Sequence, residues 1–488
     1  MKKQLTAGKL FVFGLMALLT TQFSSCGGGG SSSSGGLGDA TSVEGTVYAA
    51  NGTDPISGAV VYIPTEDSSE SSSLSAIVSK SASATCEEPS ETSCGSVCTD
   101  ENGKFTLTPG DPSTCGSTKL KFKKGTFTGE QTLDCASNTT SGVCTLADKF
   151  KVATDKNLAI AVVTGAYDEI ENTLAKLGLG ELETSTGVLK IGTEKFTIFR
   201  GGGSRDYSGY TDTTKYKASS ALFGSLTEMK KYDIIFINCG SNEDVSPSSS
   251  ESPALTAKGD SPKLSHAEYH KYLKTKLMNS SVVSNIKDYV NAGGKMYATD
   301  LAYDFVEQTF PGFMDFQDGG DGSSTTAETE DAAQDGTSGI KSDATLNNAA
   351  MKSWVSGSSI KTNTINSTTS PNSSACTTTA NGNSGSQNLN SDGTIRIGDF
   401  LSGWGVMKAA YDADTFVWIT GKVKFSGATD TTNGDSRPLT ASRKVGSSGG
   451  CLLYSSYHNS HSCPTTGFWP QERVLHYLVF EVSSSCTP

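Results

Sequence analysis

Apolar runs that alternate with helical segments constrain the fold of this 488-residue chain more than any other feature. Residues 158–163 (LAIAVV) are apolar throughout, as expected for a parallel strand covered on both faces, and residues 232–238 (YDIIFIN) repeat most of that pattern. Strands are also predicted at 195–199 and 295–299, and helices at 167–177, 282–292 and 302–310. This alternation predicts an α/β doubly wound sheet with right-handed crossovers within residues 152–488.

Residues 42–151 instead contain short β-rich segments separated by turns such as Asn51-Gly52. Strands are predicted at 42–49, 58–63, 103–108 and 119–124. Their spacing predicts a small antiparallel β-sandwich. The sequences SVEGTVY (42–48), PISGAVVYI (55–63) and TDENGKFTL (99–107) resemble the carboxypeptidase regulatory-like domain, which implies the same kind of fold.

Three stretches rich in Ser, Thr, Asn, Gly and Asp interrupt the second domain near residues 246–262, 317–344 and 357–391. They hold too few apolar residues to offset the entropy of ordering, so we predict surface loops or disorder there. Order is predicted to return at 395–404, 416–423, 451–457 and 471–482.

The first 25 residues have the pattern of a secretory signal peptide. Lys2 and Lys3 precede an apolar run at 10–19 that is too short to span a bilayer. Cys26 lies where a bacterial lipoprotein signal places its lipidated cysteine, and the segment resembles a lipobox with Phe23 in place of the usual Leu. An ordinary cleaved signal, with Cys26 as an unmodified thiol, is the alternative.

Residues 26–41 contain the run GGGGSSSSGG, which is typical of a flexible tether. The net charge of −12 argues against nucleic-acid binding and against electrostatic attachment to anionic lipid. We therefore predict an exported lipoprotein that a lipid anchor attaches to the membrane, at the outer membrane or the cell surface.

The cysteine content suits an oxidising compartment. Six of the twelve cysteines lie within residues 86–144, and no His precedes His266, so disulfides are favoured over a metal site. If Cys26 is lipidated, eleven remain and at least one is unpaired; Cys239, at the end of an apolar strand, is the best candidate. Spacing leaves the pairing of the others open: Cys86, Cys94, Cys98, Cys115, Cys135, Cys144, Cys376, Cys451, Cys463 and Cys486.

In a doubly wound sheet, ligands bind beyond the carboxyl ends of the strands. The predicted strands deliver one imidazole, one thiol, acids and other polar groups to that edge. The candidate site residues are Thr164, Cys239, Asn242, Glu243, Asp300 and His458.

Three of these segments resemble the class I glutamine amidotransferase-like superfamily, most closely its ThuA-like branch: YDIIFINCG (232–240), IKDYVNAGGKMYATD (286–300) and LLYSSYHN (452–459). The resemblance implies a flavodoxin-like fold and matches His458 to the family's histidine. The position of the family's nucleophilic cysteine falls on Asp300. A carboxylate cannot form the thioester that ammonia transfer requires, so we do not expect glutamine hydrolysis.

Three interpretations of this pocket remain open. Asp300 and His458 are a catalytic acid–base pair acting on water or a sugar hydroxyl, or they are a buried pair that stabilises the sheet edge. In the third, Cys239 is a nucleophile, although a buried inert thiol is the simpler interpretation. His266 and His270 lack the adjacent His-Glu pair of the metalloprotease motif, so we predict no metal site, and no cofactor.

We therefore predict a multidomain cell-envelope lipoprotein that acts as a non-enzymatic binding or scaffold protein, with a glycan or an envelope protein as its partner. The alternative is a hydrolase of the ThuA-like type that uses Asp300 and His458. Hydrogen-bond contact between these two side chains at the floor of an open cleft would favour the hydrolase. Burial without a cleft would favour the binding protein.

Overall fold

The computed structural model describes residues 37–65, 86–110, 115, 118–201, 209–241, 278–317, 333–357, 359–360, 362, 389–400, 404–459, 467–484 and 486. Several predictions fall outside these residues. They concern the signal peptide, the insertion at 246–262, most of the insertion at 357–391, and Cys26, Asn242, Glu243, His266, His270, Cys376 and Cys463.

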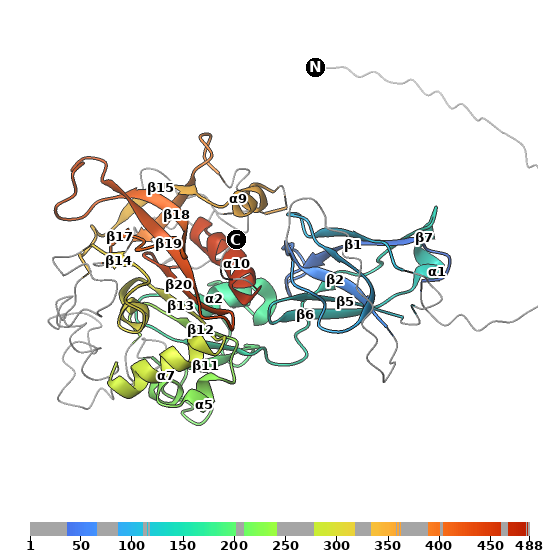
Figure 1. Ribbon diagram of the computed structural model, residues 1–488, viewed down its shortest axis with the longest axis horizontal. Helices are drawn as coiled ribbons and strands as arrows, with labels where there is room; N and C mark the ends of the chain where they lie inside the picture. Colours follow the sequence, from blue (N-terminus) through green and yellow to red (C-terminus); the bar gives the residue numbers. More distant parts are fainter. Residues whose placement is uncertain are drawn as a thin grey trace, which may run out of the picture. The chain divides into compact units, whose positions relative to one another are not determined.

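Two β-sheets form the N-terminal part of the described chain (Figure 1). One is antiparallel, in the order β3 (Ser93–Cys98), β2 (Val60–Pro64), β5 (Lys119–Lys124) and β6 (Phe127–Thr132). The other runs β4 (Lys104–Leu107), β1 (Ser42–Tyr48), β8 (Val143–Thr145) and β7 (Thr139–Thr140), with β9 (Phe150–Lys151) also on β1. A short helix, α1 (Cys135–Asn138), precedes β7.

The expectation of a wholly antiparallel sandwich is wrong for the second sheet. Strand β1 pairs with β4 in antiparallel register but with β8 and β9 in parallel register. Between β1 and β8 the chain visits the other sheet, so it returns to the neighbourhood of β1 running in the same direction. Short-range turn signals do not report such a crossover.

Disulfides cross-link this region locally. Within the described residues, Cys86 bonds to Cys98, Cys94 to Cys115 and Cys135 to Cys144, and a fourth disulfide joins Cys451 to Cys486 near the carboxyl terminus. The disulfide interpretation of the cysteine cluster is therefore confirmed. The bonds indicate an oxidising, extracytoplasmic compartment.

A nine-stranded sheet dominates the rest of the chain (Figure 1). Its first five strands are parallel and adjacent in the order β11 (Thr197–Phe199), β10 (Ile160–Val163), β12 (Ile234–Ile237), β13 (Lys295–Thr299) and β20 (Gly450–Ser455). The remaining four are antiparallel, in the order β19 (Asp435–Val445), β18 (Thr415–Val423), β15 (Ile340–Leu346) and β16 (Ile395–Phe400).

Burial on both faces explains why the parallel strands are apolar throughout. Val162 and Phe236 belong to one buried cluster, whereas their neighbours Ala161 and Ile235 belong to the other. The first cluster includes residues of α2 (Ile170–Leu174), the π-helical turn η1 (Ala175–Leu179) and α10 (Pro470–Ser484). The second includes residues of α4 (Ser219–Phe223), α5 (Leu226–Met229), α7 (Ser280–Asn291) and α8 (Asp304–Glu307). The prediction of a mixed α/β protein with more than one sheet is confirmed.

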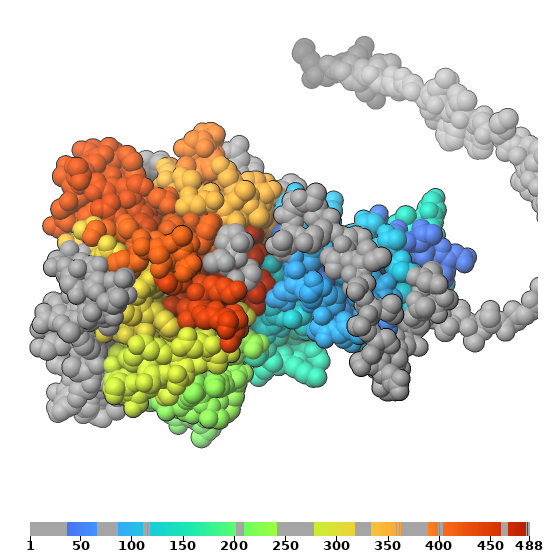
Figure 2. All heavy atoms as spheres, viewed as in Figure 1, coloured from blue at the N-terminus to red at the C-terminus, as the bar shows by residue number. Residues whose placement is uncertain are grey.

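The antiparallel half of the sheet includes residues that were predicted to lie in an insertion. Residues 340–344, assigned to a soft insertion, begin strand β15, in which Ser342, Ala344 and Leu346 are buried at alternate positions. Helix α9 (Ala349–Ser356) follows directly, and a two-stranded ribbon joins β14 (Asp315–Phe316) to β17 (Met407–Ala409). Figure 2 shows the yellow-green segment that holds α7 in contact with the orange-red carboxyl-terminal segment.

Polar contacts connect the N-terminal sheets to the residues that follow 152. Arg473 of α10 pairs with Asp54 at 3.0 Å, Lys124 of β5 pairs with Glu481 at 2.9 Å, and the Trp354 indole donates to the Pro55 carbonyl at 3.1 Å. These contacts lie within one compact unit, residues 35–488. Leu37 and Ala40 are already buried, so packing begins inside the predicted 26–41 tether.

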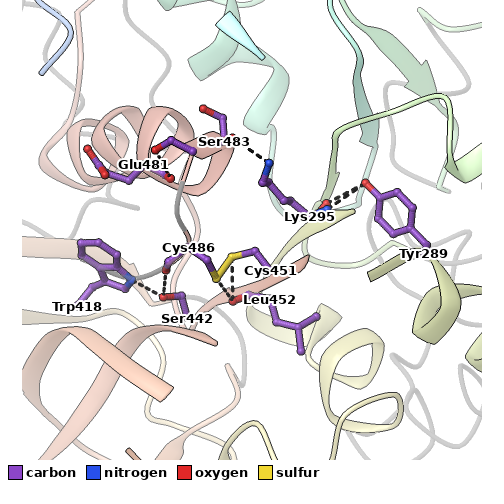
Figure 3. The surroundings of a disulfide bond; sticks show 10 residues. Tyr289, Lys295, Trp418, Ser442, Cys451, Leu452, Glu481, Ser483 and Cys486 are labelled. Atoms are coloured by element: carbon purple, nitrogen blue, oxygen red, sulfur yellow. Dashed lines mark hydrogen bonds between the residues drawn. A yellow bond between two sulfur atoms is a disulfide. The ribbon is translucent and has the colours of Figure 1, made fainter. Parts of the chain in front are cut away.

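The carboxyl terminus is attached at the centre of the large sheet (Figure 3). The Cys451–Cys486 disulfide joins β20 to the residues beyond α10, and the Lys295 ammonium donates to the Ser483 carbonyl at 2.8 Å. The Ser442 hydroxyl of β19 donates to the Cys486 carbonyl at 2.6 Å. No helix within the described ranges has both the length and the apolar character needed to cross a bilayer.

Candidate functional site

Asp300 lies at a sharp bend directly after β13. It is the first residue of the 3₁₀ turn η3 (Asp300–Ala302), and its φ of +45° is in the left-handed region. The Tyr454 hydroxyl donates to the Asp300 carbonyl at 2.9 Å, and the Gly405 amide donates to Oδ1 at 3.3 Å. A non-glycine residue held at positive φ carries strain that surrounding contacts must maintain, which makes this turn a candidate functional position.

His458 approaches that carboxylate from the next strand of the sheet. The parallel pairing of β13 with β20 sets Thr299 opposite Ser455, so the segments after both strands emerge side by side. His458 Nε2 lies 2.7 Å from Asp300 Oδ2, and the two side chains are 1% and 0% exposed. The carboxylate and the imidazole therefore form a buried pair.

The Cys239 thiol completes a three-residue centre at the end of β12. The Cys239 sulfur, an Asp300 carboxylate oxygen and a His458 ring nitrogen all lie within 4.8 Å of one another. Burial raises the pKa of the Cys239 thiol well above its usual value, and the charge of Asp300 raises it further. A thiol that stays protonated is a poor nucleophile, which argues against the third interpretation. Among the described cysteines, Cys239 is the free one, as predicted.

Asp168, which the sequence analysis missed, follows β10 and connects the ends of β10, β13 and β20 next to this centre. Its Oδ2 accepts from the Thr299 hydroxyl at 2.9 Å and from the Asn459 amide at 3.1 Å. Thr299 Oγ1 in turn accepts from the Cys239 amide at 3.0 Å. The only signal in the sequence was its place shortly after the first parallel strand.

The other predicted pocket residue that the structure describes, Thr164, has a different role. Its hydroxyl accepts from the Gly201 amide at 2.9 Å and donates to the Phe199 carbonyl at 3.4 Å, so it joins β10 to the end of β11. It shares the carboxyl edge of the sheet with the centre but binds the neighbouring strand.

Tyr167 is the solvent-facing aromatic residue beside the centre. It is 45% exposed, and its amide donates to the Cys239 carbonyl at 3.2 Å. Partial burial raises the pKa of the Tyr167 phenol, and the nearby Cys239 and Asp300 raise it further. Tyr167 is therefore close to the buried centre and partly exposed to solvent.

A separate polar cleft of about 620 Å³ lies at the opposite, amino end of β10 and β11. Its lining includes Asn157, Glu181, Thr193, Glu194, Lys195 and Lys215. Glu194 is fixed there by the Lys215 ammonium at 2.7 Å and by the Tyr216 hydroxyl at 2.9 Å. None of the three centre residues lines this cleft.

Comparison with known proteins identifies no family. No family profile matches the sequence, and no curated protein matches it. Among solved structures, the cytoplasmic protein STM3548 from Salmonella typhimurium is similar over 67% of this chain and 99% of its own, with 9% sequence identity and a TM-score of 0.30. A similarity this weak supports no conclusion about fold or function.

Proposed function

We propose that this chain is a lipid-anchored protein of the cell envelope that acts by binding and not by turnover, with a glycan as its ligand. The disulfides support an extracytoplasmic location, and the signal-like N-terminus with Cys26 supports anchoring at the outer membrane or cell surface.

The fold assignments belong to the same proposal. Counted along the chain, the parallel strands are adjacent in the order second, first, third, fourth, fifth, which is the order of a flavodoxin-like sheet. This order supports an amidotransferase-like domain, and the two N-terminal sheets support a carboxypeptidase regulatory-like domain.

The burial of Asp300, His458 and Cys239 is the observation that carries the non-enzymatic assignment. Each residue is at most 1% exposed, and the described cleft lies at the other end of the strands. A hydrolase must bring water and a scissile bond to its catalytic groups. The cleft beside β11 instead offers amide, carboxylate and ammonium groups, which pair well with sugar hydroxyls.

A glycan array probed with the purified chain tests the ligand. Asn157→Ala and Lys215→Met remove polar groups from the cleft and should weaken binding by about tenfold, or about 1.4 kcal/mol. Lys231→Met, a change to an exposed lysine that neither lines the cleft nor pairs with a lining residue, is the matched control and should leave binding unchanged. Absence of binding to any glycan, or equal loss in the control, would exclude the cleft as a glycan site.

Cys26→Ser tests the anchor. Without a thioether-forming cysteine the chain cannot carry the lipid, so the protein should move from the membrane fraction to the soluble fraction. The measurement is immunodetection after fractionation of cells that produce each form. Retention of the variant in the membrane fraction would contradict lipid anchoring at Cys26.

A hydrolase is the second candidate, because Asp300 has the positive φ of a strained turn and touches His458 at 2.7 Å. A screen of ester and glycoside substrates with Asp300→Asn and His458→Ala controls decides between the two. Turnover that both substitutions abolish would establish the hydrolase and overturn the binding assignment.

A further inference from the structure

We propose that Cys239, Asp300 and His458 form a binding site for a divalent transition-metal ion, and that zinc is the ion it fits best. The inference goes beyond glycan binding and does not depend on it, because the centre and the cleft lie at opposite ends of the parallel strands.

The three side chains converge from neighbouring strands. β12, β13 and β20 are adjacent in the sheet, and each delivers one potential ligand just beyond its carboxyl end. Tetrahedral zinc with bonds of about 2.0–2.3 Å requires ligand atoms about 3.3–3.6 Å apart. The sulfur, oxygen and nitrogen atoms are within 4.8 Å of one another, and Asp300 Oδ2 lies 2.7 Å from His458 Nε2. These separations differ from those of a coordination shell by at most about 1.5 Å, which small side-chain rotations can supply.

Charge balance favours a doubly charged ion. In their metal-binding forms the thiolate and the carboxylate each carry one negative charge, and the imidazole is neutral. A divalent cation would neutralise this set inside a site whose residues are at most 1% exposed. Burying such anions without a compensating charge would be strongly unfavourable.

The ligand types select among divalent ions. A thiolate with an imidazole suits zinc, whereas calcium and magnesium prefer shells made of oxygen. Three protein ligands leave a fourth position for water or for a bound group, as in zinc sites that are not purely structural.

Hydrogen bonds from neighbouring residues hold the ligand-bearing turns in place. The Cys239 amide donates to Thr299 Oγ1, and the Tyr454 hydroxyl and the Gly405 amide donate to the carbonyl and to Oδ1 of Asp300. Contacts of this kind orient ligands before a metal binds.

A simple Asp300–His458 hydrogen bond would give no reason for the adjacent thiol, and a metal site accounts for all three residues. This proposal departs from the sequence-based expectation of no metal site, which considered short motifs, whereas these ligands are far apart in the chain.

Cobalt substitution provides a direct test. The full-length protein, kept oxidised so that its disulfides contribute no thiols, is stripped with a chelator and titrated with Co²⁺ and, separately, with Zn²⁺. We expect one ion per chain and a thiolate-to-cobalt charge-transfer absorption. Cys239→Ser should abolish that absorption, and Asp300→Asn and His458→Gln should each weaken zinc binding by more than about a hundredfold, since even hydrogen bonds to the ligands contribute 10–100-fold.

Two controls keep the test decisive. The double variant His266→Ala/His270→Ala removes the other closely spaced histidines and should bind both ions like the unsubstituted protein. Circular dichroism of each variant confirms folding, and asparagine at position 300 tolerates the positive φ. Any of three results would overturn the proposal. The unsubstituted protein binds neither ion, metal binding survives in the double variant Cys239→Ser/Asp300→Asn, or the His266→Ala/His270→Ala control is the only variant that loses metal binding. Glycan-array signals from the stripped protein report the proposed function separately.

Discussion

The backbone at Asp300 allows strain and side-chain chemistry to be separated. Asp300→Gly and Asp300→Ala both remove the carboxylate that contacts His458, so their difference reports the positive φ alone. Because an L-residue with a Cβ is disfavoured there, Gly should exceed Ala in stability by about 1 kcal/mol, measured by denaturant unfolding. Ala302→Gly, in the same 3₁₀ turn and not at positive φ, should instead destabilise the protein. Equal stability of the two position-300 variants would contradict strain at this turn.

His476 makes the protein sensitive to acid. Its imidazole is fully buried in α10, 3.0 Å from an Arg473 nitrogen and packed between Trp354 and Phe468. The pKa of His476 is lowered from 6.5 to about 3. Burial is the largest cause, the Asp54 charge opposes it, and the Arg473 charge adds to it.

The sign of the pH dependence follows from that depressed pKa. Below about pH 6.5 the unfolded chain binds a proton at His476 that the folded chain does not bind. The free energy of unfolding therefore falls by about 1.4 kcal/mol for each unit decrease in pH until the pKa of the folded state is reached. Urea unfolding at pH 7.5 and pH 5.0 should show a loss about 2 kcal/mol larger for the unsubstituted protein than for His476→Gln. Gln keeps an acceptor for Arg473 but does not titrate. Equal losses in the two proteins would exclude His476 as the source.

At the scale of elements, the ion pair between η1 and α10 should be costly to break. Lys176 Nζ lies 2.6 Å from Glu472 Oε1, and both side chains are 1% exposed. Lys176→Met leaves a buried carboxylate without its cation and should cost about 3–5 kcal/mol in the free energy of unfolding. Adding Glu472→Gln should recover part of that loss, because it removes the unpaired charge.

An exposed pair on the same region serves as the comparison. Lys190 and Glu181 lie 3.0 Å apart but are 59% and 66% exposed, so Lys190→Met should change stability by less than about 1 kcal/mol. A Lys176→Met cost no larger than this would show that the buried pair contributes little.

Elements with a strong local pattern could be predicted from the sequence. The range of β13 matches its prediction, and β10, β12 and α7 fall within about two residues of theirs. Burial on both faces gives a strand a continuous apolar run, and burial of one helical face gives an apolar repeat of helical period, so both patterns are visible in the sequence. β19 was missed, since its sequence DSRPLTASRKV mixes polar residues and a proline with only a short buried centre.

The candidate site divides in the same way. Cys239, Asp300 and His458 were identifiable because each follows directly or closely after a predicted strand. The contributions of Asp168 and Tyr454 depend on contacts with residues more than 100 positions away, which no local pattern records.

At the scale of the whole molecule, the contacts between the N-terminal sheets and the rest predict cooperative unfolding. All four tryptophans lie between residues 354 and 469, so their fluorescence reports mainly the C-terminal part and, through the Trp354–Pro55 hydrogen bond, its contact with the N-terminal part. Far-ultraviolet circular dichroism reports the N-terminal sheets directly. Because buried pairs such as Asp54–Arg473 connect the two, the midpoints from both probes should coincide in denaturant. Two separated midpoints would show that the parts unfold independently.

The position of β20 has a consequence for how the chain matures. This strand comes from the last 39 residues, yet it lies between β13 and β19. Until β20 is in place, β13 and β19 each have an unpaired edge, and such edges can pair with strands of other chains. A polypeptide whose synthesis or export has not yet delivered residues 450–455 would therefore be vulnerable to aggregation, and would depend on chaperones during that interval.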